Sequence, residues 1–402
     1  MKKLLFFFPE NPLEKNSGNK TRVLQLLRYF KTRNIEVDFV SVSPWTSIWS
    51  EKDAAALSRC GLASDVHVLV RKPSKKNLIR YFFYYKRHQL RYKRKTDPGK
   101  SAIPVHSNYY IQTAFEQLLS SKHYDYILIS YVYWHCLIGN QELIAGSKTI
   151  LDTHDFITDQ LLHTRPDGPG GPGVPGATFE DEIRRMSLFD EVWAISTEER
   201  YIFSQFCGDK VKLVPLMLDP PSVTYPDRTA PKKFDVIYVA SDNPHNTRAA
   251  KWFFDKVYPQ LPEQIRLCVI GKISGHIGTY RNVTKISFAE DLDEFYRQSA
   301  IAMCPMLGGT GVKVKVVEAL SYGLPVVCTR RGVDGLPNKS RNGCLVSDEA
   351  SQFARNIISL LQDQTLYSEQ SRLAAELFSS HFSTETCRHT LDKAFALDQL
   401  QV

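Results

Sequence analysis

The sequence has no cysteine pattern that is typical of a metal site or a disulfide framework. None of its eight cysteines forms a CxxC motif, and several lie inside apolar runs such as LCVI (267–270) and VVCT (326–329). A free thiol in such a run behaves as a small hydrophobic side chain. We therefore expect reduced cysteines, as in the cytosol, and no metal site.

The sequence also has no long hydrophobic run near its start. The segment MKKLLFFFPENP imitates a leader peptide, but its apolar stretch extends only from Leu4 to Phe8 before polar residues follow. That stretch is shorter than the apolar region of a signal peptide or a membrane span. We expect a buried first strand here rather than a leader or an anchor.

Acidic residues are missing from the segment 71–95, RKPSKKNLIRYFFYYKRHQLRYKRK, which holds eleven Lys and Arg residues. The net charge of +8 therefore comes from this one segment. Aromatic residues between the basic ones favour contact with anionic lipid headgroups, ahead of a merely solvated helix or a nucleic-acid patch. We expect a cytoplasmic protein that is peripheral on the inner face of the plasma membrane, with no nucleic-acid partner.

The 402 residues are 43% hydrophobic, and short apolar runs alternate with segments of helical period in two successive series. Runs without clean polar alternation, separated by helices, are typical of parallel sheets covered on both faces. The sequence thus predicts an α/β protein with two Rossmann-like, doubly wound domains facing across a cleft. The predicted strands of the first series are KLLFFF (3–8), VDFVSV (37–42), DVHVLV (65–70), YILIS (126–130), KTILD (148–152), EVWAIS (191–196) and VKLVPL (211–216), and those of the second are FDVIYVA (234–240), IRLCVIG (265–271), TKISF (284–288), AIAMCP (300–305), LPVVCT (324–329) and CLVS (344–347).

Proline-rich sequence between the two series marks the predicted boundary. We expect an N-terminal domain over residues 1–215, a linker over 216–233, a C-terminal domain over 234–380, and a helical tail over 381–402 that packs back on the N-terminal domain. A second irregular stretch, RPDGPGGPGVPGAT (165–178), is rich in Gly and Pro and is expected to form a loop, with a lid as its candidate role.

Two groups of polar residues follow predicted strands in the first domain, where ligands of such folds usually bind. Ser17, Gly18, Asn19 and Lys20 follow the first strand and precede a helix, so they either line a binding site or cap the helix. His154 follows the strand that ends at Asp152. Beside two carboxylates it could orient a substrate hydroxyl or hold a proton, although a packed histidine with capping aspartates is equally consistent.

The third group is GGTGVKVKVVEALSYG (308–323). VKVKVV alternates like a strand, but EALSYG continues as a helix former with a terminal glycine, which favours a helix over 312–322. On that helix Lys315 and Glu318 share one face. The glycines let backbone amides approach a phosphate, and the helix N-terminus adds partial positive charge.

The run GGTGVKVKVVEALSYGLPVVCTRRGVDGL resembles the C-terminal signature of glycosyltransferase family 4, the glycosyl transferases group 1, which have the GT-B fold. The similarity extends over most of residues 234–361, whereas the N-terminal half is similar mainly in the order of its elements, its early glycine loop and DTHD. The resemblance implies a metal-independent, retaining transferase without a cofactor, which takes its sugar from a nucleotide-diphosphate donor bound mainly by the C-terminal domain.

The resemblance also implies residue roles. Glu318 matches the family's ribose-binding glutamate, and His154 matches a catalytic-site histidine that contacts the donor sugar. Gly18 matches the N-terminal glycine loop. The remaining donor-binding residues are then Gly308, Gly309, Thr310, Gly311, Lys313 and Lys315.

Two departures from the family pattern bear on the donor site. Thr310 occupies a position where the family often has a second glutamate. Ser241 and Asn246 lie near the positions where the family usually has a pair of basic residues. Lys313, Lys315 or Arg248 must then offset the phosphate charge.

We therefore predict a retaining, hexosyltransferase-like enzyme that transfers a sugar to a glycan or lipid-linked acceptor in bacterial surface polysaccharide or glycolipid synthesis. Its partners are the nucleotide-sugar donor, that acceptor and an anionic membrane surface met by residues 71–95. The two departures favour an alternative, a non-catalytic sugar-nucleotide-binding protein, and a sugar-nucleotide epimerase of similar architecture is a further one.

Overall fold

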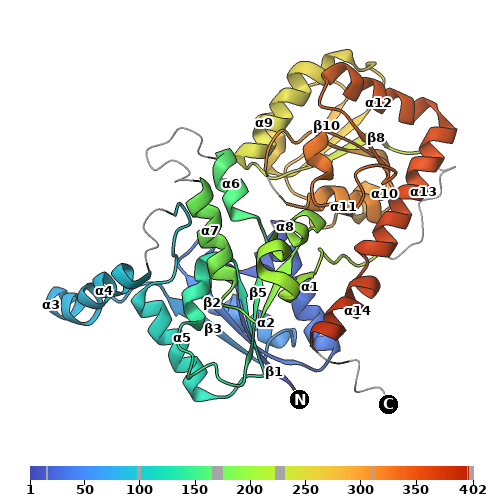
Figure 1. Ribbon diagram of the computed structural model, residues 1–402. Helices are drawn as coiled ribbons and strands as arrows, with labels where there is room; N and C mark the ends of the chain where they lie inside the picture. Colours follow the sequence, from blue (N-terminus) through green and yellow to red (C-terminus); the bar gives the residue numbers. More distant parts are fainter. Residues whose placement is uncertain are drawn as a thin grey trace. The chain divides into compact units, whose positions relative to one another are not determined.

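The computed structural model describes residues 1–14, 17–96, 101–164, 175–221, 231–309, 311–395 and 397. The chain forms two compact units, Met1–Leu213 and Val214–Val402. Each unit is built on one sheet in which every described strand pair is parallel, and helices cover the sheet faces (Figure 1).

The sheet of the N-terminal unit has the strand order β3-β2-β1-β4-β5-β6-β7. The chain moves outward from β1 to β3 and then returns to the other side of β1, so the strand order reverses between β1 and β4. Such a reversal leaves a crevice at the carboxyl ends of the two strands. The strands are β1 (Lys3–Phe7), β2 (Glu36–Ser43), β3 (Asp65–Val70), β4 (Tyr126–Ser130), β5 (Lys148–Asp152), β6 (Glu191–Ala194) and β7 (Val211–Leu213).

The helices of this unit connect successive strands, as right-handed parallel crossovers require. They are α1 (Gly18–Thr32), α2 (Glu51–Arg59), α3 (Leu78–Tyr81), α4 (Arg87–Thr96), α5 (Tyr109–Ser121), α6 (Ile157–Thr164), α7 (Pro175–Met186) and α8 (Thr197–Cys207), with a π-helical turn η2 (Phe82–Lys86) and a 3₁₀ segment η3 (Val132–Ile138).

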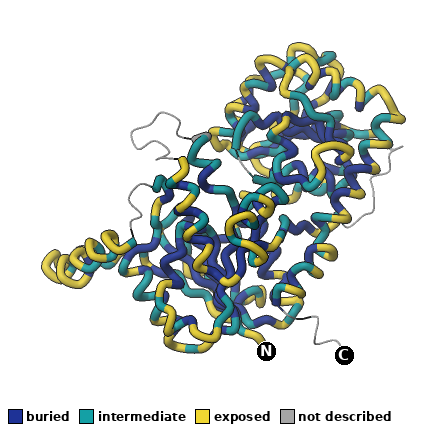
Figure 2. Tube along the Cα trace, in the orientation of Figure 1, coloured by how far each residue is buried: buried dark blue, intermediate teal, exposed yellow. Residues whose placement is uncertain are grey.

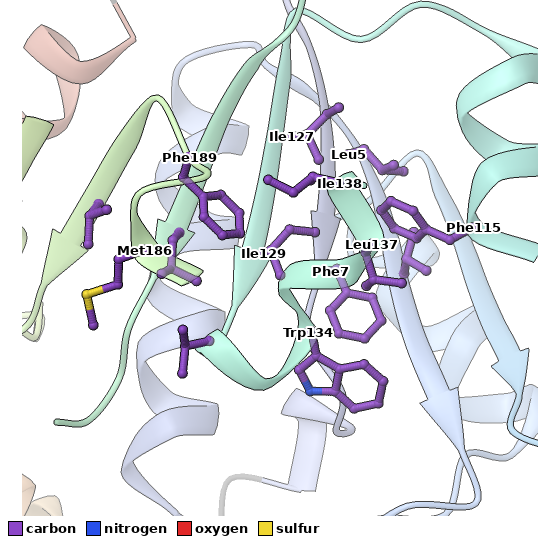
Figure 3. Packing of buried hydrophobic residues seen from close by; sticks show 14 of the residues in the cluster. Leu5, Phe7, Phe115, Ile127, Ile129, Trp134, Leu137, Ile138, Met186 and Phe189 are labelled. Carbon is purple, nitrogen blue, oxygen red and sulfur yellow. The ribbon is translucent and has the colours of Figure 1, made fainter. Parts of the chain in front are cut away.

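The core of the N-terminal unit forms where η3 and α5 pack on the sheet. Figure 3 shows Phe7 of β1 between Phe115 of α5 and Trp134 of η3, and its ring centroid lies 6.1 Å and 4.9 Å from theirs. All three side chains are buried. Burial of each such side chain contributes about 1.5–3 kcal/mol, so this contact fixes η3 directly after β4.

The C-terminal unit has the strand order β10-β9-β8-β11-β12-β13, which reverses between β8 and β11. Its strands are β8 (Phe234–Val239), β9 (Leu267–Ile270), β10 (Val283–Ile286), β11 (Ser299–Cys304), β12 (Val326–Cys328) and β13 (Cys344–Val346). Its helices are α9 (Pro244–Trp252), α10 (Asp293–Arg297), α11 (Val314–Ser321), α12 (Ala350–Gln362), α13 (Gln364–His381) and α14 (Thr384–Ala394), and a π-helical turn η5 (Phe253–Val257) extends α9.

These elements confirm the predicted fold class of two Rossmann-like domains. Each of the thirteen predicted strands coincides with a strand of the structure. The ambiguous VKVKVV run is helical from Val314, because Val316, Val317 and Leu320 form one buried face of α11. The predicted loop over 165–178 is wrong at its end, because residues 175–178 form the first turn of α7, where Pro175 is compatible with a helix start. Residues 165–174 lie outside the described residues. The packing of the tail on the N-terminal domain stays a prediction.

The basic segment forms an arm, defined here as α3, η2 and α4, that extends from the N-terminal unit (Figure 1). Its surface is largely exposed (Figure 2), and among its described residues only Tyr85 is buried. Among the helices that the structure describes, none combines the length and the apolar character needed to cross a membrane.

Candidate active site

The glycine loop before α11 has the backbone that its sequence predicts. Gly309 and Gly311 have φ angles of +88° and +72°, which side chains other than glycine rarely adopt. Gly308 and Gly309 also lie against His245, because a Cβ placed on Gly308 would be 3.5 Å from the ring Nδ1. Thr310 lies outside the described residues. The loop therefore places compact backbone directly before the start of α11.

Lys313 holds this loop in shape. Its Nζ donates hydrogen bonds to the backbone oxygens of Gly309 at 3.2 Å and Gly311 at 2.7 Å, and its side chain is buried. These two carbonyl oxygens face the ammonium group. The positive charge stays beside the loop, where it adds to the field of the α11 N-terminus.

Lys315 reaches across the point where the strand order reverses between β8 and β11. Its Nζ donates to Asn246 Oδ1 at 2.8 Å and lies 5.2 Å from the centre of the Tyr238 ring. Asn246 in turn donates from Nδ2 to Ser241 Oγ at 3.1 Å. Burial lowers the pKa of Lys315 below its usual value. The Lys315 amino group thus lies beside Asn246, which is itself bonded to Ser241; these two residues occupy the positions near the family's usual basic pair.

Glu318 is hydrogen-bonded to α10 and also lies near Lys315, whose charge acts on the carboxyl group. The hydroxyl of Tyr296 donates to Glu318 Oε2 at 3.0 Å, and the Tyr296 ring stacks on Tyr322 with centroids 4.9 Å apart. Burial raises the pKa of Glu318 to about 7. The carboxyl group is thus half-buried, keeps one oxygen bonded to a tyrosine, and is close to changing charge at neutral pH.

His245 is a further candidate that the sequence patterns did not single out. It lies in the first turn of α9, whose N-cap Asn243 accepts a hydrogen bond from Asn246 N at 2.9 Å. Burial, followed by the charges of Lys313 and Arg248, lowers the pKa of His245. A neutral imidazole therefore lies against the glycine loop. Its only signal in the sequence is its place just after a strand.

In the N-terminal unit, two strained residues lie at the carboxyl ends of neighbouring strands. Tyr131 follows β4 with φ 67° and ψ 133°, and His154 follows β5 with φ 61°. Their rings stack with centroids 4.4 Å apart. Each such backbone costs about 1–3 kcal/mol, and strain of this kind concentrates at functional sites.

Behind His154 lies a buried ion pair. Asp152 Oδ2 is 3.1 Å from His154 Nε2, and Arg22 donates to both oxygens of Asp152 at 2.8–3.1 Å. Burial alone would raise the pKa of Asp152, but the charges of Arg22 and His154 lower it below its usual range. The charged carboxylate fixes one edge of the imidazole. Both ring nitrogens of His154 are buried and make no hydrogen bond of good geometry with a described residue, and only Nε2 lies within ion-pair distance of a carboxylate.

The loop after β1 meets the Tyr131 and His154 rings through Phe8, at 6.4 Å and 5.8 Å between ring centroids, and through Asn19. Asn19 Nδ2 donates to the Tyr131 hydroxyl at 2.9 Å, across the reversal point between β1 and β4. Gly18 begins α1, and Ser17 at its N-cap makes no capping bond with its side chain but donates to Asn19 Oδ1 at 2.5 Å. Lys20 is buried and pairs with Glu10 and Glu14, so its charge is offset within the loop.

One group of described residues has the spacing of metal ligands, namely Asp38, Asp65 and His67. Asp38 Oδ2 already lies 2.6 Å from Lys122 Nζ and accepts a bond from the Tyr124 hydroxyl at 2.7 Å. Because the Lys122 ammonium group already offsets the charge of Asp38, a metal cation would have to compete with it for this carboxylate oxygen. The group is also remote along the strands from the carboxyl ends described above, since Asp38 and Asp65 are paired near the start of β2 and β3.

The chain thus has two Rossmann-like units, which is the architecture of the GT-B fold. Both units place polar side chains at the carboxyl ends of the strands, where the strand order reverses and where ligands of such folds bind. Residues 233–363 match the family described as "Glycosyl transferases group 1". This match confirms the family resemblance predicted from the sequence.

Solved structures with the same fold cover the whole chain. HepE of Anabaena in complex with UDP and glucose superposes with a TM-score of 0.68 at 14% identity, over 98% of this chain and 100% of that one. Sucrose-phosphate synthase of Thermosynechococcus elongatus superposes with a TM-score of 0.68 at 14% identity, over 100% of both chains. An uncharacterized 44.6 kDa protein in the cps region of Klebsiella pneumoniae is 25% identical over 281 residues, 61% of this chain and 68% of its own length.

Proposed function

We propose that this chain is a retaining glycosyltransferase, which moves a sugar from a nucleotide-diphosphate donor to a glycan or lipid-linked acceptor. The observation that carries the proposal is the cluster around α11, where a glycine loop, Lys315 and Glu318 meet at the reversal point of the C-terminal sheet. The family match over the same residues supports it. The relative in a cps region favours a role in bacterial surface polysaccharide or glycolipid synthesis.

The donor nucleotide would bind with its ribose at Glu318. One oxygen of this carboxyl group accepts from Tyr296, which leaves the other oxygen to accept from ribose hydroxyls. The diphosphate would lie at the glycine loop, where backbone amides and the α11 N-terminus favour negative charge. Lys315 would supply the cation that the family usually places near Ser241 and Asn246.

Transfer breaks the bond between the sugar carbon C1 and the diphosphate oxygen and forms a bond from C1 to the acceptor oxygen. Negative charge then grows on the diphosphate, and the loop amides and Lys315 stabilise it. The acceptor hydroxyl gives its proton to the departing phosphate, so a strong protein base is not required. Charge stabilisation by amides and lysines also makes a metal ion unnecessary.

His154 would contact the donor sugar near its reacting carbon. The Asp152–Arg22 pair holds the ring, and the Tyr131 ring stacks on it. The unpartnered Nδ1 is then the atom that meets a hydroxyl of the sugar. Ser17, Gly18 and Asn19 would line the acceptor side of the same edge.

A sugar-nucleotide-binding protein without activity is the second candidate, because Thr310 and the Ser241–Asn246 pair depart from the family pattern. The position of Lys315 beside Asn246 argues for an enzyme, since it restores a cation to that corner. An epimerase would use the same donor but would release an altered sugar.

The test begins with UDP-glucose, because HepE was solved with UDP and glucose, and extends to GDP-, ADP- and TDP-sugars in a thermal-shift panel. A ligand at 100 times its dissociation constant adds about 2.7 kcal/mol of stability. The stabilising donor is then incubated without acceptor. Slow hydrolysis that persists in EDTA and releases the retained anomer supports the proposal. Donor binding without turnover would favour the non-catalytic binding protein. An isomerised nucleotide sugar as product would favour the epimerase.

We propose further that the arm docks the protein on an anionic membrane from the cytoplasmic side. Its basic residues come with strongly exposed apolar ones, including Ile79 (74% exposed), Tyr84 (73%) and Leu78 (70%). Cations near an anionic bilayer each contribute roughly 1 kcal/mol, and apolar side chains enter the headgroup boundary. The arm belongs to the N-terminal unit, on which the acceptor is expected to bind.

A further inference from the structure

A row of rings follows the carboxyl edge of the N-terminal sheet and begins at His154. Tyr131 stacks on His154, and the Tyr133 ring lies 6.1 Å from that of Tyr131. His106 follows at 4.8 Å from Tyr133, and Trp45 follows at 4.7 Å from His106. The row joins the loops after β4 and β2, two strands on either side of β1.

The rings of Trp45, His106 and Tyr133 are half-buried, and a buried residue supports them from below. Trp134 is 1% exposed, and its ring lies 5.5 Å from Trp45 and 6.0 Å from His106. Backbone bonds fix the loops as well, since His106 N donates to Tyr133 O at 3.2 Å and Tyr131 N donates to Asp152 O at 2.9 Å. The rings are therefore held in place without a ligand.

Arg71 lies at the far end of the row and carries a charge that no described acid offsets. Its guanidinium carbon is 4.5 Å from the centre of the Trp45 ring. No carboxylate among the described residues lies within ion-pair distance of it, and Asn108 Nδ2 holds the segment by donating to Arg71 O at 2.8 Å. Burial, with the charges of Arg71 and Arg185, lowers the pKa of His106 to about 4, so His106 is neutral and leaves the charge at this end of the row to Arg71.

We infer that the row formed by Tyr133, His106 and Trp45, ending at Arg71, is a binding platform for an acidic acceptor oligosaccharide. This inference rests on the proposed transferase function and names its acceptor class. The apolar C–H face of a sugar ring packs on an aromatic face, whose electron density attracts those hydrogens. Successive rings suit successive sugars, and Arg71 suits a uronate carboxylate or a phosphate on the glycan.

The row starts beside His154, so a glycan lying on it would present one end near the proposed reacting carbon. Its other end would reach Arg71, the first residue of the basic segment that leads into the arm. The same layout would guide a glycan from a membrane-bound carrier toward the reaction. A row of rings that merely sealed the core would need neither half-exposed side chains nor, at its end, a cation without an acidic partner among the described residues.

The experiment measures oligosaccharide binding to the full chain by saturation-transfer NMR and calorimetry, with maltotriose, chitotriose and the trimer of galacturonic acid as probes. We expect the acidic trimer to bind best. Trp45→Ala should weaken binding about tenfold or more, while Trp45→Phe keeps a ring and most of the affinity. Arg71→Gln should abolish the preference for the acidic trimer over the neutral ones.

Trp49→Ala is the matched control, because Trp49 is also half-buried but packs on Phe39 and donates to Ser41, outside the row. It should bind the trimers as the parent chain does. Donor hydrolysis without acceptor separates the two proposals, since it needs no platform. Hydrolysis with no trimer bound, or equal losses in Trp45→Ala and Trp49→Ala, overturns the platform and leaves the transferase. If the chain neither binds nor hydrolyses any donor, the proposed function is overturned. Trimer binding is measured independently of the donor, so the platform can then still be supported or overturned by its own result.

Discussion

At the scale of single residues, Glu318 gives the sharpest test of the donor site. Glu318→Gln keeps the shape of the side chain but removes the charged acceptor of the ribose hydroxyls. The loss is on the order of 1.5–3 kcal/mol, or about ten- to hundred-fold in nucleotide affinity by calorimetry. Glu294→Gln, on an exposed residue of α10, should change nothing. Unchanged affinity in Glu318→Gln would remove the ribose role.

The pH dependence of binding follows from the same group. Its pKa is about 7 without ligand, and the ionised form is the better acceptor. Nucleotide affinity should therefore rise between pH 6 and 8 and level off above, and Glu318→Gln should flatten this rise. A pH profile that keeps its slope in the variant would point to another titrating group.

Lys315 is expected to act on the diphosphate. Lys315→Ala should reduce the affinity for a nucleoside diphosphate by about tenfold or more and leave the bare nucleoside almost unaffected, because only the phosphates carry charge. The control is Lys251→Ala, on an exposed position of α9. Equal losses for both ligands would mean that Lys315 holds Asn246 and Tyr238 in place rather than binding phosphate.

His154→Ala should lower turnover by about 100-fold while donor affinity changes little, because an interaction near the reacting carbon is strongest during reaction. Steady-state kinetics on a soluble acceptor measure the difference. The exposed His123→Ala is the control. A normal turnover number would leave His154 as a packed, strained histidine.

The sequence singled out the candidate site residues that belong to a local pattern and missed their partners from distant parts of the chain. Glu318, Lys315 and the glycines lie within one short run. The partners Tyr296 and Asn246 lie 22 and 69 positions away along the chain. Tyr131 also gave no signal, because its strained backbone appears only when β4, β5 and α1 come together.

At the scale of elements, hydrophobic period predicted the strands because parallel strands buried on both faces read as unbroken apolar runs. The π-helical turns at 82–86 and 253–257 were not predicted. One wider turn shifts the spacing of the apolar residues by a single position. In a short segment such a shift cannot be told from ordinary variation in the hydrophobic pattern.

The arm is the element with a prediction of its own. Co-sedimentation with liposomes should rise with anionic lipid and fall with salt, because exposed charges are screened. It should also drop in the variant that changes Lys75, Lys76, Arg80, Lys86 and Arg87 to Gln. The control variant loses the same number of charges outside the arm and should bind as the parent does. It changes five exposed lysines to Gln, namely Lys52, Lys212, Lys251, Lys256 and Lys272. Binding that ignores lipid charge would contradict the docking proposal.

At the scale of the whole molecule, buried acids should make the chain less stable as pH rises. Burial raises the pKa of Glu182 to about 7 and that of Glu199 to about 8, against 4.5 in the unfolded chain. The folded state then binds more protons than the unfolded state. The associated stability is full below about pH 4.5 and is lost as pH rises through 7 and 8, at up to about 1.4 kcal/mol per pH unit for each group.

Thermal melts between pH 5.5 and 8.5 measure this trend. The double variant Glu182→Gln and Glu199→Gln should show a flatter profile over that range. In Glu199→Gln the amide oxygen can keep the bond from Ile195 N, whereas in Glu182→Gln it can keep only one of the two bonds from Ile157 N and Thr158 N. The single variant Glu199→Gln is therefore measured beside the double variant, because it loses no backbone bond. A profile as steep as that of the parent would assign the trend to other groups.

The backbone at Tyr131 has a consequence for directed evolution. Its φ and ψ combination suits glycine, so selection for heat resistance alone would favour replacing this tyrosine by a residue that relaxes the turn. Such a clone would lose the ring that stacks on His154 and the hydroxyl that meets Asn19. Thermostable descendants of this chain should therefore be screened for activity at every round, because position 131 is where robustness and turnover compete.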